Sequence, residues 1–284
     1  MTIFLRHNIP DFYFEAFCDA NIGESLNSGA RHVWITDRRL SSLWRRVSFD
    51  AFLTRLGNPE QSGPAIELTT TTVSDLATGY SSLIKKTETS SILDSEDRIK
   101  LSFLVLTLLT EAGTPNHKRK EEVIEANQFT WENFESAIAG AQAQANRTRS
   151  SLRLPEGDLL DHGMHFILNR TGYPFVTSDR AIFVDSWDSL EAKRTFGRLG
   201  VLDEDVSGTT ERVIYLPLSP EAALVSSAFI KRGYASEPYI ECAVEEEVFL
   251  LNLLACYSAD PIIVSSKERP FGRFQLKAQS LLTS

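Results

Sequence analysis

The segment YPFVTSDRAIFV, residues 173–184, decides more of the fold than any other stretch. Two apolar runs rich in β-branched and aromatic residues flank a polar centre, Thr177 to Arg180, and each run is typical of a strand. We therefore expect a hairpin whose bend carries a carboxylate, two hydroxyls and a guanidinium. Burying such groups without partners costs about 1–3 kcal/mol each. They should therefore form either a hydrogen-bonded cluster or a functional site.

Mainly helical patterns precede this segment, and mainly strand patterns follow it. Apolar spacing predicts helices at 9–18, after Ser48, at 72–84, from 94 through the apolar run Leu101 to Leu109, and at 118–127, 130–149, 159–168 and 241–257. Short apolar runs predict strands at 33–36, 212–218, 223–227 and 260–266, with the second and third forming an antiparallel hairpin around Ser-Pro. The polar stretch 185–210 is expected to be a surface excursion.

This order predicts an α+β fold, with N-terminal and central helices packed on a small, mainly antiparallel C-terminal sheet. At 284 residues, with 42% hydrophobic and 24% charged residues, the composition is that of a globular protein. We expect a single domain over 1–284, with a helical part at about 70–170 and a strand-rich part at about 172–266.

The composition also indicates the cellular compartment in which we expect the protein. No apolar run approaches the ~18–20 residues that a membrane helix needs, and residues 1–6 lack the pattern of a signal peptide. We therefore expect a soluble protein of the bacterial cytoplasm that has no membrane partner. The three cysteines are far apart and form no C-x-x-C pair, which argues against a disulfide framework or a thiolate zinc site. They are expected to be small buried residues.

The net charge of −9 gives no overall attraction to nucleic acid. Basic residues are nevertheless concentrated in one early segment, at Arg38, Arg39, Arg45 and Arg46. They are either solvated surface residues or a local face that contacts the phosphates of a nucleic acid or nucleotide. The second interpretation requires the four guanidinium groups to converge in space.

Four residues are candidates for catalysis: His7, Ser178, Asp179 and Arg180. An imidazole titrates near neutral pH and can act as a base or a ligand, and Arg180 could stabilise developing negative charge. A structural alternative stays open, because His7 could brace a helix start and Asp179 could bind backbone N–H groups within a turn. An acid/base or metal site requires His7 and Asp179 to meet.

Asp161, His162 and His165 are the candidate metal ligands. On a helix they would share one face with Asp158, at three- and four-residue steps, and could bind a divalent metal. The alternative is a polar helix face, since the H-E-x-x-H pattern is absent. The sequence also lacks a P-loop, a G-x-G-x-x-G after a strand, and a G-x-S-x-G elbow. These absences argue against P-loop phosphate transfer, Rossmann dinucleotide binding and an α/β-hydrolase.

The order of motifs resembles a bacterial family of unknown function, the 4238 type. The resemblance rests on the opening HNIPDFYFEAF at 7–17, the strand HVWITD at 32–37, the FVTSD segment at 175–179, the LPLSP strand at 216–220, and a later helix with a central Asn252. This chain has Ala181 where that family usually has proline. The resemblance implies a fold and a set of matching positions, and it implies no activity.

Two functional hypotheses follow. The first is a hydrolase of phosphodiesters or nucleotides, a nuclease-like effector of bacterial stress or phage defence, which would use His7 and Asp179. The second is a non-enzymatic protein-binding or sensor module, in which Ser178, Asp179 and Arg180 hold a hairpin. Co-location of His7, Asp179 and the Asp161/His162 group in one cleft would favour the enzyme.

Overall fold

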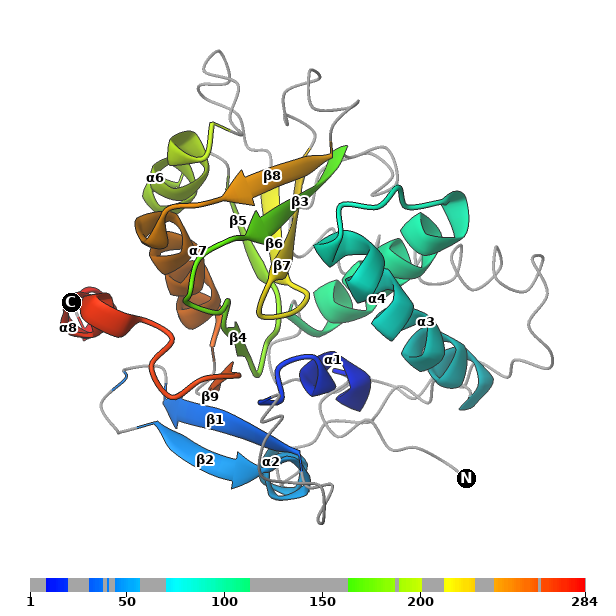
Figure 1. Ribbon diagram of the computed structural model, residues 1–284, viewed down its shortest axis with the longest axis horizontal. Helices are drawn as coiled ribbons and strands as arrows, with labels where there is room; N and C mark the ends of the chain where they lie inside the picture. Colours follow the sequence, from blue (N-terminus) through cyan, green and yellow to red (C-terminus); the bar gives the residue numbers. More distant parts are fainter. Residues whose placement is uncertain are drawn as a thin grey trace.

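The computed structural model describes residues 9–19, 31–37, 40, 44–56, 70–112, 163–186, 189–200, 212–227, 238–259 and 262–283. Within these residues the chain forms helices and two sheets whose neighbouring strands are mostly antiparallel (Figure 1). The predicted α+β class is therefore confirmed. The helices predicted at 118–127 and 130–149 lie outside the described residues.

The smaller sheet has four strands, and every neighbouring pair is antiparallel. Its order is β2 (Arg45–Ser48), β1 (His32–Asp37), β9 (Ile262–Ser265) and β4 (Thr177–Ser178). It therefore brings together segments from the beginning, the middle and the end of the sequence. The strands predicted at 33–36 and 260–266 are both present, as β1 and β9.

The larger sheet has five strands, in the order β5 (Phe183–Ser186), β6 (Arg212–Pro217), β7 (Ala222–Ser227), β3 (Gly163–Asn169) and β8 (Tyr239–Cys242). Its neighbours are antiparallel except for β3 and β8, which are parallel. The predicted hairpin around Ser219-Pro220 is confirmed as β6 and β7. The Ser219 hydroxyl stabilises the turn by accepting hydrogen bonds from the N–H groups of Glu221 and Ala222.

The hairpin predicted within 173–184 is wrong. β4 pairs with β9 in the smaller sheet, whereas β5 pairs with β6 in the larger one. The Thr-Ser-Asp-Arg segment is therefore a crossing from one sheet to the other. An apolar run within a segment indicates a buried strand, but it does not show which strand lies beside it.

The helix predicted at 159–168 is also wrong where the structure describes it, because residues 163–169 form β3. Phe166, Ile167 and Leu168 are consecutive and all buried. A short continuous apolar run fits a strand covered on both faces as well as a buried helix. Within the predicted surface excursion at 185–210 lies a further helix, α6 (Leu190–Arg198), whose N-cap Ser189 accepts a hydrogen bond from the Ala192 N–H.

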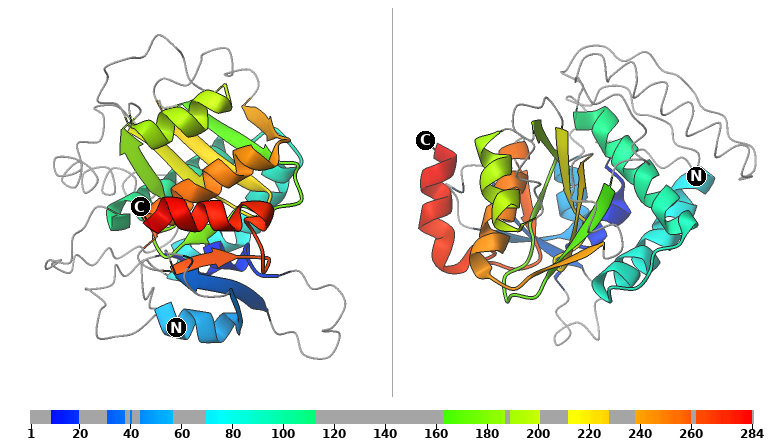
Figure 2. Two further views of the ribbon diagram at one scale, coloured as in Figure 1. Left: turned by 90° about the vertical axis from the view of Figure 1, so that its left-hand side faces the viewer. Right: turned by 90° about the horizontal axis from the view of Figure 1, so that it is seen from above.

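Helices cover both faces of the larger sheet (Figures 1 and 2). α3 (Thr70–Glu88) and α4 (Ser95–Ala112) lie on one face, and α6 and α7 (Glu245–Ser258) lie on the other.

The short α1 (Asp11–Glu15) packs against α3, and α2 (Phe49–Leu56) packs on β1 and β2. α2 begins directly after Ser48, whose hydroxyl accepts the Ala51 N–H at 3.3 Å, as the sequence predicted. The chain ends with a 3₁₀ turn, η2 (Gly272–Phe274), and α8 (Gln275–Thr283), which packs on α7.

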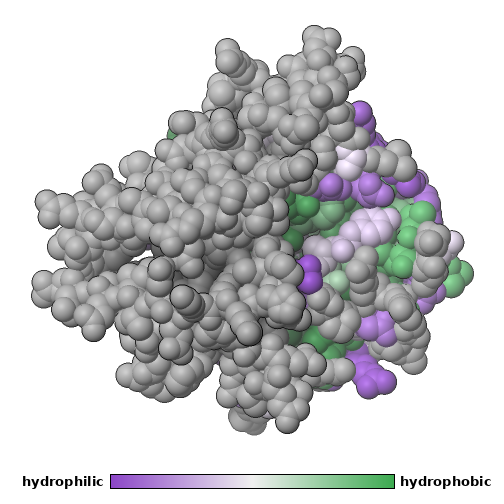
Figure 3. Space-filling model, turned by 180° about the vertical axis from the view of Figure 1, so that it is seen from behind, coloured by the Kyte–Doolittle hydropathy of each residue, from purple (hydrophilic) through white to green (hydrophobic). Residues whose placement is uncertain are grey.

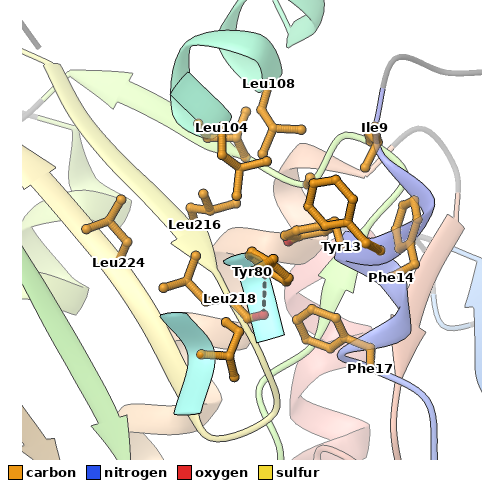
Figure 4. Close-up of a cluster of buried hydrophobic side chains, with 14 of the residues drawn as sticks. Ile9, Tyr13, Phe14, Phe17, Tyr80, Leu104, Leu108, Leu216, Leu218 and Leu224 are labelled. Carbon is orange, nitrogen blue, oxygen red and sulfur yellow. Dashed lines mark hydrogen bonds between the residues drawn. The ribbon is translucent and has the colours of Figure 1, made fainter. Parts of the chain in front are cut away.

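The largest buried cluster joins α1, α3 and α4 to one face of the larger sheet (Figure 4). It includes Tyr13, Phe17, Leu104 and Leu216, which are at most 3% exposed. A second cluster fills the space beneath α6 and α7. Seen from behind, the described surface mixes hydrophobic and hydrophilic residues (Figure 3). Across the described ranges, every helix is too short or too polar to cross a membrane.

Candidate functional site

Three of the four candidate catalytic residues lie at the end of β4 and in the turn that follows it. Ser178 is fully buried, and its hydroxyl lies 3.1 Å from the hydroxyl of Ser258 at the end of α7. It also accepts the Arg180 N–H at 3.4 Å, and the Ala181 N–H closes the turn on the Ser178 carbonyl at 2.9 Å. The Ser178 side chain therefore links the turn to α7 and has no access to solvent.

Asp179 extends the pairing of β4 with β9 by one residue. Its N–H donates to the Ile262 carbonyl at 3.0 Å, and its Oδ2 accepts the Ile262 N–H at 3.1 Å. The carboxylate thus replaces a backbone carbonyl at the end of the ladder, where a backbone N–H would otherwise lack a partner. Arg180, the next residue, is exposed. Of the three, Ser178 is buried, Asp179 is half-buried and Arg180 is the most exposed.

The backbone of this turn takes an unusual path at Ala181, where φ is +55°. Proline fixes φ near −65° and lacks an N–H, so it fits neither this conformation nor the Ala181-to-Ser178 hydrogen bond. The backbone conformation of Ala181 therefore disfavours proline at this position. The buried Ala181 methyl packs in the core cluster of α1, α3 and α4.

Tyr13 of α1 connects the turn segment to both sheets. Its phenol donates to the Pro217 carbonyl of β6 at 2.7 Å and lies 2.6 Å from the Thr177 hydroxyl of β4. Because the phenol has one hydrogen, Thr177 is the donor in the second bond. Burial raises the pKa of the Tyr13 phenol far above its usual range, so the group is a neutral structural linker rather than a base.

Asn252 of α7 binds the backbone of the residues that lead into β4. This residue is fully buried in the middle of α7. Its amide group donates to the Pro174 carbonyl at 3.0 Å, and its side-chain oxygen accepts the Val176 N–H at 2.9 Å. The two bonds satisfy extended backbone that pairs with no strand at these positions. The sequence indicated Asn252 only through the family resemblance.

A further pair, which the sequence did not indicate, lies on the β6–β7 turn. Tyr80 of α3 donates to the Leu218 carbonyl at 2.6 Å (Figure 4), and the Ser219 hydroxyl donates to Glu88 at 2.6 Å. Burial raises the pKa of the Glu88 carboxyl, the Ser219 hydrogen bond opposes this rise, and Glu221 adds to it. The sequence signal that could have indicated this pair is Glu88 itself, an acidic residue in the last turn of a helix, where the helix dipole disfavours negative charge.

The remaining candidates do not gather at this turn within the described residues. His7, Asp161 and His162 lie outside those residues, as do Arg38 and Arg39. His165 is 3% exposed and lies on β3 rather than on a helix, so the shared helical face predicted for the metal ligands is wrong for this residue. Within the described residues, no group of three or more His, Cys, Asp or Glu is arranged to hold a metal ion.

The two arginines of β2 point to opposite sides of the smaller sheet, because successive strand residues alternate. Arg46 is paired with Asp19, at 2.9 Å between Nε and Oδ2, whereas Arg45 is exposed opposite Ile35. Nearby, Arg31 pairs with Glu15 at 2.7 Å. Arg45 and Arg46 therefore leave the strand on opposite faces of the sheet, and Arg46 is paired with a carboxylate.

One acidic grouping does form at the end of the smaller sheet. Asp37 ends β1 opposite Ile262, and Asp179 binds Ile262 from the other side. The two acidic residues thus lie on either side of Ile262 in β9, about 10 Å apart because two strand spacings separate them. Arg180 directly follows Asp179 in the chain. This arrangement is the nearest to a polar site among the described candidates.

The chain matches the family described as "Protein of unknown function (DUF4238)" over residues 6–269. It therefore belongs to this family, as its motif order indicated. No curated protein sequence and no solved structure matches the chain.

Proposed function

We propose that this chain is a non-enzymatic protein-binding or sensor module of the bacterial cytoplasm. The observation that carries the proposal is the use of Ser178 and Asp179 in hydrogen bonds that hold the turn to α7 and β9. Ser178 is buried at 0% exposure, and the Asp179 carboxylate binds a backbone N–H. Both side chains therefore have a structural role that requires no substrate. The net charge of −9 favours a protein partner over nucleic acid.

Two substitutions at one position test this proposal. Asp179→Ala removes the acceptor of the Ile262 N–H and should lower the free energy of unfolding by about 1–3 kcal/mol. Asp179→Asn keeps an oxygen acceptor and should retain most of the stability. Glu268→Ala, an exposed position, is the matched control and should change stability by less than about 0.5 kcal/mol. If Asp179→Ala leaves stability unchanged or raises it, Asp179 behaves as a functional residue and the proposal fails.

The second candidate is a hydrolase of phosphodiesters or nucleotides, acting as a nuclease-like effector in stress or phage defence. It is favoured by the grouping of Asp37, Asp179 and the exposed Arg180 at one end of the smaller sheet. Under this candidate Asp179 acts with His7, and Arg180 stabilises negative charge on the phosphate. A divalent metal bound by the carboxylates would be consistent with this chemistry.

Cleavage assays with single- and double-stranded nucleic acids and with nucleotides, each with and without Mg²⁺ or Mn²⁺, test the second candidate. It predicts cleavage by the unmodified protein and its loss in Asp37→Asn and Asp179→Asn, with an unchanged melting temperature. Cleavage that persists in both variants would assign the activity to another site. Absence of cleavage by the unmodified protein would remove this candidate for the substrates tried.

A further inference from the structure

β8 ends the larger sheet among the described strands, and in Figure 1 it lies at the front of that sheet with no described helix drawn across it. It runs parallel to β3, with Tyr239 opposite Phe166 and Glu241 opposite Leu168. The Phe166 N–H donates to the Pro238 carbonyl, and the Arg170 N–H donates to the Cys242 carbonyl. In a parallel ladder this pattern turns residues 238, 240 and 242 toward β3. The N–H and C=O groups of Tyr239 and Glu241 therefore point to the outer edge.

The side chains along this edge are largely apolar for a strand that no described strand covers on its outer side. Ile240 is half-buried on the α6 and α7 side, and Tyr239 is half-buried on the other side, where its hydroxyl donates to the Ser91 carbonyl. Ile92, next to Ser91, is 90% exposed, and Val244, just beyond β8, is 45% exposed. These are two of the three large exposed hydrophobic residues in the described part of the chain. Open strand edges with such side chains pair readily with a further strand.

We propose that β8 pairs with β8 of a second copy of this chain, antiparallel and about a two-fold axis at Ile240. In that register Tyr239 of each copy lies opposite Glu241 of the other, and each such pair exchanges two backbone hydrogen bonds. The two copies of Ile240 then form the close, non-hydrogen-bonded pair at the centre. The result is one continuous ten-stranded sheet, built from the five strands of each copy.

The positions of Tyr239 and Glu241 along β8 make its outer edge complementary to a second copy in this register. A shift by one pair in one direction would place Glu241 opposite Glu241, which like-charge repulsion disfavours; a shift in the other direction would place Tyr239 opposite Tyr239. In the proposed register each carboxylate faces a tyrosine, and Arg170 already pairs with Glu241 within its own chain at 3.1 Å. The edge is thus complementary to itself, without a net charge brought into the interface. This proposal goes beyond the proposed function and does not depend on it.

Sedimentation of the full chain tests the pairing. We expect a particle of twice the chain mass for the unmodified protein and a monomer for Glu241→Pro, which removes an outward N–H and no bond to β3. Glu241→Gln, which loses the ion pair but keeps the N–H, is the matched control and should remain dimeric. A monomeric unmodified protein, or a dimer that survives Glu241→Pro with unchanged circular dichroism, would overturn the proposal.

A crosslink gives a second readout that does not depend on proline. In the proposed register the Cα atoms of the two Ile240 residues lie about 4.5 Å apart, within the range a disulfide spans. Ile240→Cys should therefore give a covalent dimer on mild oxidation. Leu276→Cys, on the 80% exposed residue of α8, should not. Equal crosslinking of both variants, or of neither, would count against β8 as the interface.

Discussion

The phenol oxygen of Tyr13 lies 2.6 Å from the Thr177 hydroxyl, and this contact ties the first helix to a strand 164 residues later in the chain. The same phenol donates to the Pro217 carbonyl of the other sheet. One buried hydroxyl therefore satisfies polar groups of both sheets at the place where the chain crosses between them. The crossing depends on this hydroxyl because neither partner has access to water there.

Tyr13→Phe should lower the free energy of unfolding by about 1–3 kcal/mol, since the Thr177 hydroxyl and the Pro217 carbonyl each lose a buried partner. Urea unfolding measures the change. Thr177→Val should be destabilising alone but add little to Tyr13→Phe, because the two substitutions remove the same bond. Full additivity would show that the contact contributes nothing.

Tyr215→Phe is a matched contrast. Tyr215 is also fully buried, but its hydroxyl makes no hydrogen bond with a described residue. Removing a buried hydroxyl that lacks a partner should leave stability unchanged or raise it by about 1 kcal/mol. The same urea experiment applies. A loss as large as that of Tyr13→Phe would mean that the Tyr215 hydroxyl has a partner in solution.

Asn252→Asp should be strongly destabilising at neutral pH. The substitution keeps an acceptor for the Val176 N–H but places a carboxylate against the Pro174 carbonyl, which then loses its donor. A buried unpaired carboxylate binds a proton more tightly in the folded state, so the deficit should shrink as pH falls. Thermal unfolding across pH measures this, and a deficit that does not depend on pH would contradict it.

Substitutions at Ala181 should follow backbone geometry. Ala181→Pro cannot take φ of +55° and removes the N–H that binds Ser178, so it should cost about 3 kcal/mol or more. Ala181→Gly relieves about 1 kcal/mol of left-handed strain but loses a buried methyl of similar value, so it should be close to neutral. Denaturation midpoints of the two variants should therefore differ widely; similar midpoints would argue against the left-handed turn.

Glu88 should make stability depend on pH. Its pKa in the folded protein is raised from the ordinary value of 4.5 by burial. A raised pKa means that its contribution to stability is fully present below pH 4.5 and is lost as pH rises through the folded pKa. Glu88→Gln should therefore gain melting temperature relative to the unmodified protein between about pH 4 and pH 7. Glu221→Gln, at an exposed neighbour, should show a smaller gain; equal gains would assign the effect to general surface charge.

Local patterns predicted much of the fold. The β6–β7 hairpin, the start of α2 after Ser48, and the strands at 33–36 and 260–266 depend on neighbouring residues, such as a Ser-Pro turn or a capping serine. Where one pattern fits two structures, the prediction was wrong. The consecutive buried residues of β3 fit a helix as well as a strand, and His165 was assigned to the wrong kind of element for that reason.

Local sequence patterns could not predict the roles of the turn residues. The sequence showed that Ser178 and Asp179 needed partners, because polar groups beside buried strands cannot stay unpaired. Whether those partners were a substrate, a metal or the protein itself depended on residues some 80 positions away, Ser258 and Ile262. Such contacts are set by the packing of α7 and β9 onto the turn.

The sequence by itself determined the α+β class, the family and the polar character of the crossing segment, because these follow from composition, periodicity and motif order. Only the tertiary structure decided that the segment joins two sheets and that Thr177, Ser178 and Asp179 bind side-chain and backbone groups of distant elements. The physical reason is that strand pairing and the satisfaction of buried polar groups are long-range properties. Segments distant in sequence meet only when the whole chain has folded.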